Sequence, residues 1–150
     1  VACLEALVYA HGKGVIHRDI KPDNIFLCRN GEVRLVDFGL AKLVEQSIQT
    51  ATLAGSPAYM SPEAWDQKVG PSCDLWSVAV VMFQCLTGSL PFPSLQGVVG
   101  RTAVAPRVTL QAEDTPTHGH LVDVVACALT MSREDRHPTA TAMLAAVKGV

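Results

Sequence analysis

Apolar positions along the chain predict one short hairpin within a mostly helical fold. Two apolar runs, residues 25–28 and 33–36, flank the pair Asn30 and Gly31. Asn-Gly is the strongest short-range hairpin signal, because both residues accept a positive φ. The two runs are therefore predicted to pair antiparallel.

The register of this hairpin has a chemical consequence. A two-residue turn at Asn-Gly places Asn24 opposite Asp37, and Phe26 opposite Leu35. Facing side chains lie about 5 Å apart at Cβ, so an amide oxygen and a carboxylate would converge on one point, as Mg²⁺ requires. Strand alternation would put Phe26 and Leu35 on the same face, as an apolar floor beside the metal.

Helical periodicity covers much of the remaining chain. A first helix is predicted to end near His11, because Gly12 and Gly14 follow it and glycine tolerates the positive φ found after helix ends. Apolar residues also recur at helical spacing in residues 121–130 and 139–147.

The longest apolar stretch, residues 75–86, is too short to span a bilayer. It is predicted to be a core helix that is apolar all round because other helices surround it. Ser72 or Asp74 can cap its start, and Gly88 and Pro91 mark its end.

Two polar motifs flank the first strand and follow the second. The motifs are His-Arg-Asp-Ile-Lys-Pro-Asp-Asn at residues 17–24 and Asp-Phe-Gly at 37–39. Together they supply a base, a cation and two metal ligands, although either motif alone is more often a plain loop or turn. Three further features follow in order: Gly-Ser-Pro-Ala-Tyr-Met-Ser-Pro-Glu at 55–63, Asp-Leu-Trp-Ser at 74–77, and Arg136.

In this order and spacing the motifs resemble those of eukaryotic-type protein kinases, from the catalytic loop to the end of the activation segment and the central helix. The resemblance implies a partial protein-kinase-like fold (α+β), namely the mostly α-helical C-terminal lobe with a small β-hairpin. Residues 1–150 would then be a partial kinase domain without its N-terminal lobe. A lysine two residues after the catalytic aspartate resembles the serine/threonine class, and residues 24–27 look most like NIMA-related kinases.

The resemblance also implies a role for each motif residue. Asp19 would accept the proton of the substrate hydroxyl as that hydroxyl attacks ATP. Lys21 would neutralise charge on the transferring phosphoryl group. Asn24 and Asp37 would hold Mg²⁺ against the ATP phosphates, and Phe26 would lie under the adenine.

Regulatory residues follow from the same resemblance. Arg18 would bind a phosphate on the activation segment, because a guanidinium matches phosphate oxygens. Thr50 and Thr52 are candidate acceptors, although each is as readily read as an exposed polar loop residue. Ser56 replaces the usual threonine, and its hydroxyl can bridge the catalytic aspartate and lysine.

Structural roles fall on three charged residues. The resemblance pairs Glu63 with Arg136 as an ion bridge that anchors the activation segment to the helical core, and it puts Asp74 at the start of the central helix. The bridge is expected to be buried, because Pro62 and Trp65 flank the glutamate.

Composition and charge limit the domain size, the partners and the cellular compartment that can be expected. With 150 residues, 49% of them hydrophobic, the chain is one domain or part of one and can bury a sizeable core. With a net charge of −2, the chain lacks the excess of basic residues that is typical of nucleic-acid-binding proteins. No membrane partner is expected. Five scattered cysteines without a Cys-x-x-Cys pair indicate a reducing compartment, the cytoplasm or the nucleus.

Three hypotheses for function remain open. The chain is part of a serine/threonine kinase that takes ATP and a protein substrate, a non-catalytic binding module, or a pseudokinase scaffold. Gly12-Lys13-Gly14 is a false match to a phosphate-binding loop, because it follows a helix and His17 stands at the last glycine position. The sequence offers no candidate for the strand lysine that pairs with the ATP phosphates, so the 150 residues alone are expected to be inactive. The intact catalytic residues favour a kinase.

Overall fold

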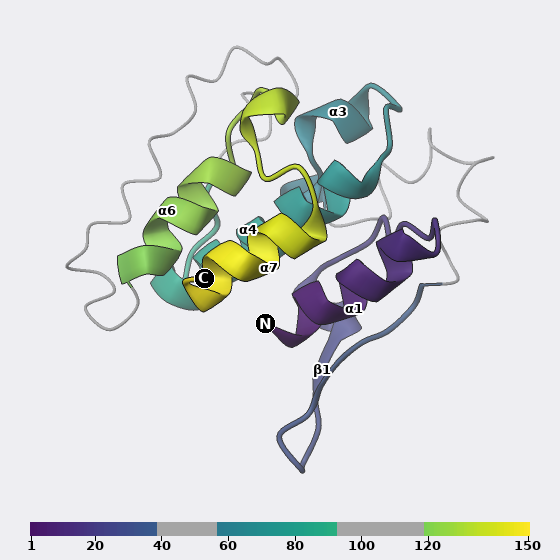
Figure 1. Cartoon of the computed structure of the whole chain (residues 1–150), viewed down its shortest axis with the longest axis vertical. Coiled ribbons are helices and arrows are strands. Elements are labelled where there is room, and N and C mark those ends of the chain that lie inside the picture. Colours follow the sequence, from purple (N-terminus) through teal and green to yellow (C-terminus); the bar gives the residue numbers. More distant parts are fainter. Residues whose placement is uncertain (39–56, 93–118) are drawn as a thin grey trace.

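The computed structural model describes residues 1–38, 57–92 and 119–150, in which helices pack around α4 and a small hairpin projects at one end (Figure 1). The elements in chain order are α1 (Ala2–Gly12), η1 (Pro22–Asn24), β1 (Ile25–Leu27), β2 (Val33–Leu35), η4 (Pro57–Tyr59), α3 (Pro62–Trp65), α4 (Pro71–Thr87), α6 (Gly119–Ala128), η5 (Arg133–Asp135) and α7 (Ala140–Lys148).

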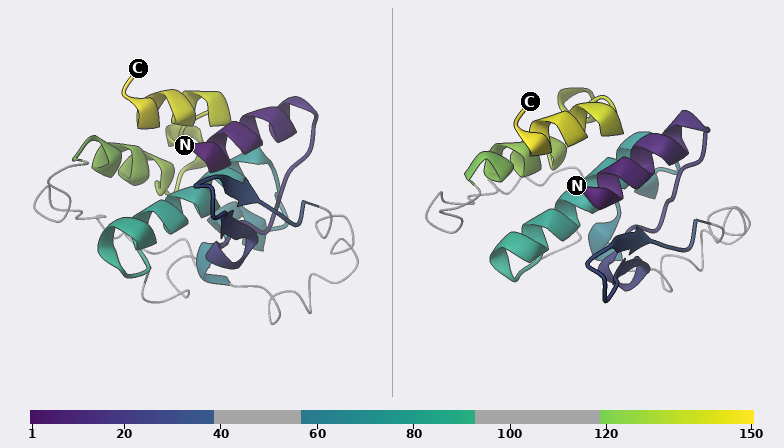
Figure 2. Two further views of the ribbon diagram at one scale, coloured as in Figure 1. Left: turned by 90° about the horizontal axis from the view of Figure 1, so that it is seen from below. Right: turned by 60° about the horizontal axis from the view of Figure 1, so that its bottom comes forward.

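The core lies where α4 meets α1, α6 and α7, and the views of Figure 2 show these helices side by side. Side chains from all four helices are almost fully buried there, including Leu7, Trp76, Val80, Val125 and Met143. Burying one such side chain contributes about 1.5–3 kcal/mol, so packing of the helices on α4 is the main source of stability. No helix within the three described ranges is long and apolar enough to cross a membrane.

The predicted ends of α1 and α4 are confirmed, and α7 begins within one residue of the predicted helical run. Helix α1 ends at Gly12, and Gly14 follows it with φ 72°. Helix α7 begins after Thr139, whose side-chain oxygen accepts a hydrogen bond from the backbone N–H of Ala142 at 3.1 Å. Gly88 ends α4 in the left-handed conformation, with φ 74°.

The start and the burial of α4 differ from the prediction. Its N-cap is Gly70, and Pro71 occupies the first helical position, where a missing N–H costs nothing. Ser72 and Asp74 lie inside the first turn and bond groups outside the helix, so neither is the cap. Side chains from Cys73 to Val80 are buried, whereas those that follow are mostly half-buried. The expectation of an all-round buried helix therefore holds only for the first half.

Strands β1 and β2 pair antiparallel as predicted, but the predicted register is wrong by one residue. The observed pairs are Ile25 with Leu35, Phe26 with Arg34, and Leu27 with Val33.

The turn explains the shift of register. Cys28 N–H donates to Glu32 O at 2.7 Å, and Gly31 N–H donates to Cys28 O at 2.9 Å, with Gly31 at φ 83°. The connection is therefore a three-residue loop closed by a left-handed glycine, the next most common hairpin after the two-residue turn.

The new register separates the two residues expected to form one apolar floor. Ile25 and Leu35 face each other and pack against the helical core. Phe26 lies opposite Arg34 and is 55% exposed. The expectation that Phe26 and Leu35 share a face is therefore wrong.

Candidate active site

Three of the predicted site residues meet at the catalytic loop, between α1 and β1. Lys21 Nζ lies 2.9 Å from Asp19 Oδ2. Asn24 Nδ2 donates to Asp19 Oδ2 at 3.0 Å and to the Asp19 backbone oxygen at 2.7 Å. The Asp19 side chain is still 41% exposed, so one carboxylate is oriented by a cation and an amide and remains accessible to a hydroxyl.

Asp74 of α4 fixes the backbone that precedes this carboxylate. Its side chain is 1% exposed and accepts the backbone N–H of His17 at 2.9 Å and of Arg18 at 2.8 Å. His11 Nε2 lies 2.8 Å from the same carboxylate. A buried carboxylate needs such partners to offset the loss of water. The sequence analysis put Asp74 at the helix start and missed these contacts. The available signal was an acidic residue at the head of an apolar helix.

His17 links the catalytic loop to the segment after β2. Asp19 N–H donates to His17 Nδ1 at 3.3 Å, so this nitrogen is unprotonated. The proton therefore sits on Nε2, which donates to Val36 O at 2.7 Å. The ring packs edge-on against Phe38, with centroids 4.6 Å apart. His17 therefore connects the backbone of Asp19 to Val36 and to Phe38.

Asp37 reaches the site by a different route from the one predicted. Val36 N–H donates to Asn24 O at 3.0 Å, so Val36 is the backbone partner of Asn24, and Asp37 follows it. Asp37 has φ 64° and Arg18 has φ 70°. Left-handed backbone in a residue with a Cβ costs roughly 1–3 kcal/mol and is concentrated at functional sites. Arg18 directly precedes Asp19, and Asp37 directly follows the backbone partner of Asn24, so the two left-handed residues mark these two segments as the candidate active site.

The residues present fit a metal ion held together with a nucleotide. The described ranges contain no group of three or more His, Cys, Asp or Glu side chains that could hold a metal by themselves. Both hydrogen bonds of Asn24 to Asp19 come from its amide nitrogen, so its oxygen is oriented away from those acceptors. Mg²⁺ is usually held through one or two carboxylates plus substrate phosphates and water. The Asn24 amide oxygen and the Asp37 carboxylate are oxygen ligands of the kind that would hold Mg²⁺ together with substrate phosphates and water.

The expected ion pair between Glu63 and Arg136 is present and buried. Arg136 Nη1 and Nη2 donate to Glu63 Oε1 and Oε2 at 2.7 and 3.0 Å. The side chains are 1% exposed for Arg136 and 8% for Glu63. Arg136 also donates to the backbone oxygens of Thr130 and Met131, and its guanidinium lies 4.7 Å from the Trp76 ring centre.

The environment of Glu63 favours its ionised form. Burial acts to raise the pKa of this carboxyl, but hydrogen bonds from Arg136, its own backbone and Ser72, together with the charge of Arg136, lower the pKa below its ordinary value. Ser72 Oγ donates to Glu63 Oε1 at 3.1 Å. Ser72 therefore supports the ion pair from the first turn of α4.

Further contacts that the sequence analysis missed hold the segment before α3 on α4. Ser77 Oγ donates to Tyr59 O at 2.7 Å, and Tyr59 OH donates to Gln84 Oε1 at 2.7 Å. These are contacts over long sequence separations, and no local pattern indicates them.

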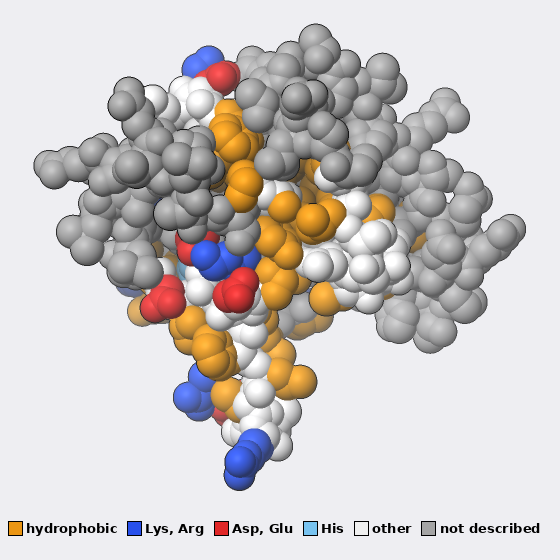
Figure 3. Space-filling view, turned by 180° about the vertical axis from the view of Figure 1, so that it is seen from behind, with side chains coloured by type: hydrophobic (Ala, Val, Ile, Leu, Met, Phe, Trp, Pro, Cys, Tyr) orange, Lys and Arg blue, Asp and Glu red, His pale blue; other side chains and the backbone are white. Residues whose placement is uncertain are grey.

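The remaining predicted site residues are placed only in part. Phe26 is exposed on the hairpin, and Figure 3 shows apolar side chains there, below a small group of acidic and basic ones. Arg18 is exposed. Thr50, Thr52 and Ser56 lie outside the described residues.

The helical arrangement, the small hairpin and the oriented carboxylate agree with the family that comparisons identify. The protein kinase domain family matches residues 1–146. The chain belongs to this family.

Known relatives agree with that assignment. The chain is similar to the serine/threonine-protein kinase unc-51 of Caenorhabditis elegans, with 41% identity over 103 residues that cover 61% of this chain and 12% of that protein. It is similar to the serine/threonine-protein kinase PknL of Mycobacterium tuberculosis (strain ATCC 25618 / H37Rv), with 34% identity over 158 residues that cover 98% of this chain and 38% of that protein.

A solved structure titled "PpkA-294 apo form" has the same fold, with a TM-score of 0.78 and 25% sequence identity. The match covers 96% of this chain and 50% of that one. The chain therefore spans half or less of the length of each of these three proteins. Similarity to NIMA-related kinases in particular stays a prediction.

Proposed function

We propose that the protein is a serine/threonine protein kinase that transfers the γ-phosphate of ATP to serine or threonine hydroxyls of protein substrates. The observation that carries this proposal is the Asp19 carboxylate, which Lys21 and Asn24 orient while it stays accessible. The names of the relatives, which are serine/threonine-protein kinases, support the same reaction.

In this proposal Asp19 accepts the proton of the attacking hydroxyl, and Lys21 balances the negative charge on the transferring phosphoryl group. Asn24 and Asp37 would hold Mg²⁺, which when bound with ATP neutralises phosphate charge. A positioned general base contributes typically about 10²–10⁴ in rate. His17 and Asp74 do not touch the reacting groups and serve to position the loop.

The experiment uses the complete natural polypeptide that contains these residues, with labelled ATP, Mg²⁺ and a generic basic protein substrate. Asp19→Asn should lower turnover by about 10²–10⁴ while leaving nucleotide binding nearly intact. Asp135→Asn, which changes an exposed carboxylate in η5, is the matched control and should leave turnover unchanged. No transfer by a folded, activation-segment-phosphorylated sample would favour the alternative, a pseudokinase or kinase-like scaffold.

We also propose that residues 1–150 are the C-terminal lobe of the domain and do not act alone. The hairpin exposes Phe26, Leu27 and Val33, apolar side chains that a nucleotide and a second lobe would cover. Calorimetry with Mg-ATP should show binding to residues 1–150 that is much weaker than binding to the complete polypeptide. Equal affinities would contradict the partial-domain proposal.

The five free thiols support a location in the cytoplasm or nucleus.

A further inference from the structure

A hollow lies between α3 and η5, and Figure 1 shows these elements at the opposite end of the described structure from the hairpin. Its volume is about 380 Å³, within the range of roughly 300–1,000 Å³ found for ligand sites. The lining residues are Pro62, Glu63, Lys68, Met131, Ser132, Arg133 and Glu134.

The backbone on both sides of this hollow is held by hydrogen bonds. Lys68 N–H donates to Glu63 O at 3.0 Å, and the Cys73 thiol lies 3.9 Å from Lys68 O. On the other side, Arg136 N–H donates to Arg133 O at 3.3 Å. The hollow is thus largely formed before any ligand arrives, as binding sites usually are.

The floor of the hollow cannot serve a ligand. Glu63 already accepts hydrogen bonds from Arg136 and Ser72. The guanidinium N–H groups of Arg136 donate to Glu63 and to the backbone oxygens of Thr130 and Met131. The ion pair is therefore electrically balanced, and recognition has to come from the rim.

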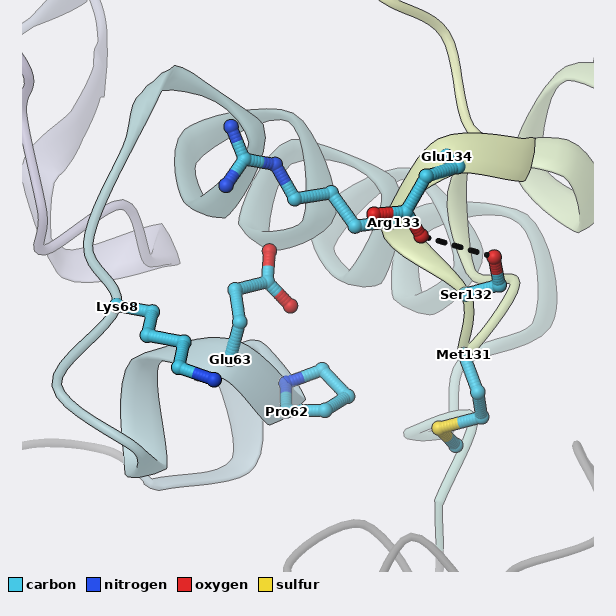
Figure 4. Close-up of a pocket in the computed structure, with 7 residues that line it drawn as sticks. All are labelled: Pro62, Glu63, Lys68, Met131, Ser132, Arg133 and Glu134. Carbon is cyan, nitrogen blue, oxygen red and sulfur yellow. Dashed lines mark hydrogen bonds between the residues drawn. The ribbon is translucent and has the colours of Figure 1, made fainter.

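The rim carries two cations and one anion. Lys68 and Arg133 have no side-chain hydrogen bond or ion pair within the described part of the chain. Ser132 Oγ donates to Glu134 Oε2 at 3.2 Å, the bond dashed in Figure 4. A hydrogen bond from the Glu134 backbone, the bond from Ser132 and the nearby charges of Arg133 and Arg136 lower the pKa of the Glu134 carboxyl, so it is ionised. Two positive charges and one negative charge leave a rim charge of one positive unit.

Figure 4 shows the Arg133 guanidinium and the Lys68 ammonium on opposite sides of the Glu63 carboxylate, so a carboxylate bound by one cation would be attracted by the charge of the other. Arg133 extends from the η5 side toward the loop that carries Lys68. Its Nη2 would lie 3.7 Å from a Cβ added at Gly70, so the guanidinium runs along the glycine backbone. Pro62 and Met131 supply apolar surface at the side of the hollow away from the Arg133 guanidinium, and a short aliphatic stem can pack against it.

We propose that this hollow is a docking site for the carboxylate of an acidic side chain on a protein partner. A single carboxylate neutralises the rim and matches the planar guanidinium fork of Arg133. A phosphate dianion would leave one uncompensated negative charge beside Glu63 and Glu134. The site is independent of the transfer reaction, because none of its lining residues belongs to the catalytic loop.

The test is NMR titration of the ¹⁵N-labelled complete polypeptide, without nucleotide, using N-acetyl-glutamate amide as the probe. Saturable shifts are expected at the backbone amides of Gly70 and Ser132, and the uncharged N-acetyl-glutamine amide should give none. Loss of its charge-assisted hydrogen bonds should weaken probe binding by about tenfold or more in Arg133→Ala, and loss of the Lys68 charge should weaken it by a smaller factor in Lys68→Ala.

Arg29→Ala, which removes an exposed arginine from the hairpin loop, is the matched control and should bind like the parent protein. Arg133→Lys should restore part of the affinity lost in Arg133→Ala, because it keeps the charge without the fork. Equal binding of the glutamine probe, tighter binding of blocked phosphoserine, or no saturable shifts with any probe would each overturn the proposal.

Discussion

Removing one partner of the buried Glu63–Arg136 ion pair tests the fold and the site together. Arg136→Ala leaves the Glu63 carboxylate buried, with Ser72 and Cys73 as its remaining side-chain partners. It also removes two hydrogen bonds to backbone oxygens and the contact of the guanidinium with Trp76. Breaking a buried pair in this way costs about 3–5 kcal/mol of unfolding free energy.

Urea denaturation of the parent, Arg136→Ala, Glu63→Gln and the double variant would measure this cost. The four free energies give the coupling between the two side chains. Each kcal/mol lost should lower the melting temperature by about 2–4 °C for a domain of this size.

The exposed pair between Lys148 and Glu5 is the matched control. Its atoms lie 2.9 Å apart, but the side chains are 44% and 51% exposed, so Lys148→Ala should cost roughly 0–1 kcal/mol. A cost for Arg136→Ala no larger than that of Lys148→Ala would refute the reasoning, because it would show that burial adds nothing to the pair.

Three further outcomes are expected. Because the pKa of Glu63 is below its ordinary value, its contribution to stability is complete above about pH 4.3 and is lost as the pH falls through the lower, folded-state pKa. Urea denaturation between about pH 5 and pH 3 should therefore show a steeper loss of stability in the parent than in Glu63→Gln. Asp74→Asn should cost about 1–3 kcal/mol in urea denaturation, because one buried backbone N–H of the catalytic loop loses its acceptor. A smaller cost would show that the loop is held by other contacts. Iodoacetamide should modify the exposed Cys85 well before Cys73, since burial raises the pKa of the Cys73 thiol and limits access. Mass spectrometry of timed samples would check the order.

Local signals predicted several elements correctly. Asn30 and Gly31 indicated the hairpin, and Gly88 indicated the end of α4, because Gly31 and Gly88 lie where the backbone has a positive φ. The register could not be read in the same way. A two-residue and a three-residue loop both place Gly31 in the turn, and only the hydrogen bonds of Cys28 distinguish them.

The residues of the candidate site were predicted better than the hydrogen bonds that hold them in place. Asp19, Lys21 and Asn24 lie within six positions of each other, so the motif itself places them near one another. Two of the three partners of Asp74 are backbone N–H groups 56 and 57 positions away, and backbone groups carry no sequence signal. The exposure of Phe26 depends on the loop length and was missed for the same reason as the register.

The start of α4 explains why a mostly apolar helix carries buried polar residues. Asp74 holds the backbone before the Asp19 carboxylate, Ser72 donates to Glu63, and Ser77 donates to the backbone of Tyr59. A buried polar group costs free energy unless it is hydrogen-bonded, and each of these has its bond to a different segment. The first two turns of one helix therefore position both the loop with the proposed base and the segment that leads to the ion pair. Any substitution that shifts this end of α4 should disturb the two together.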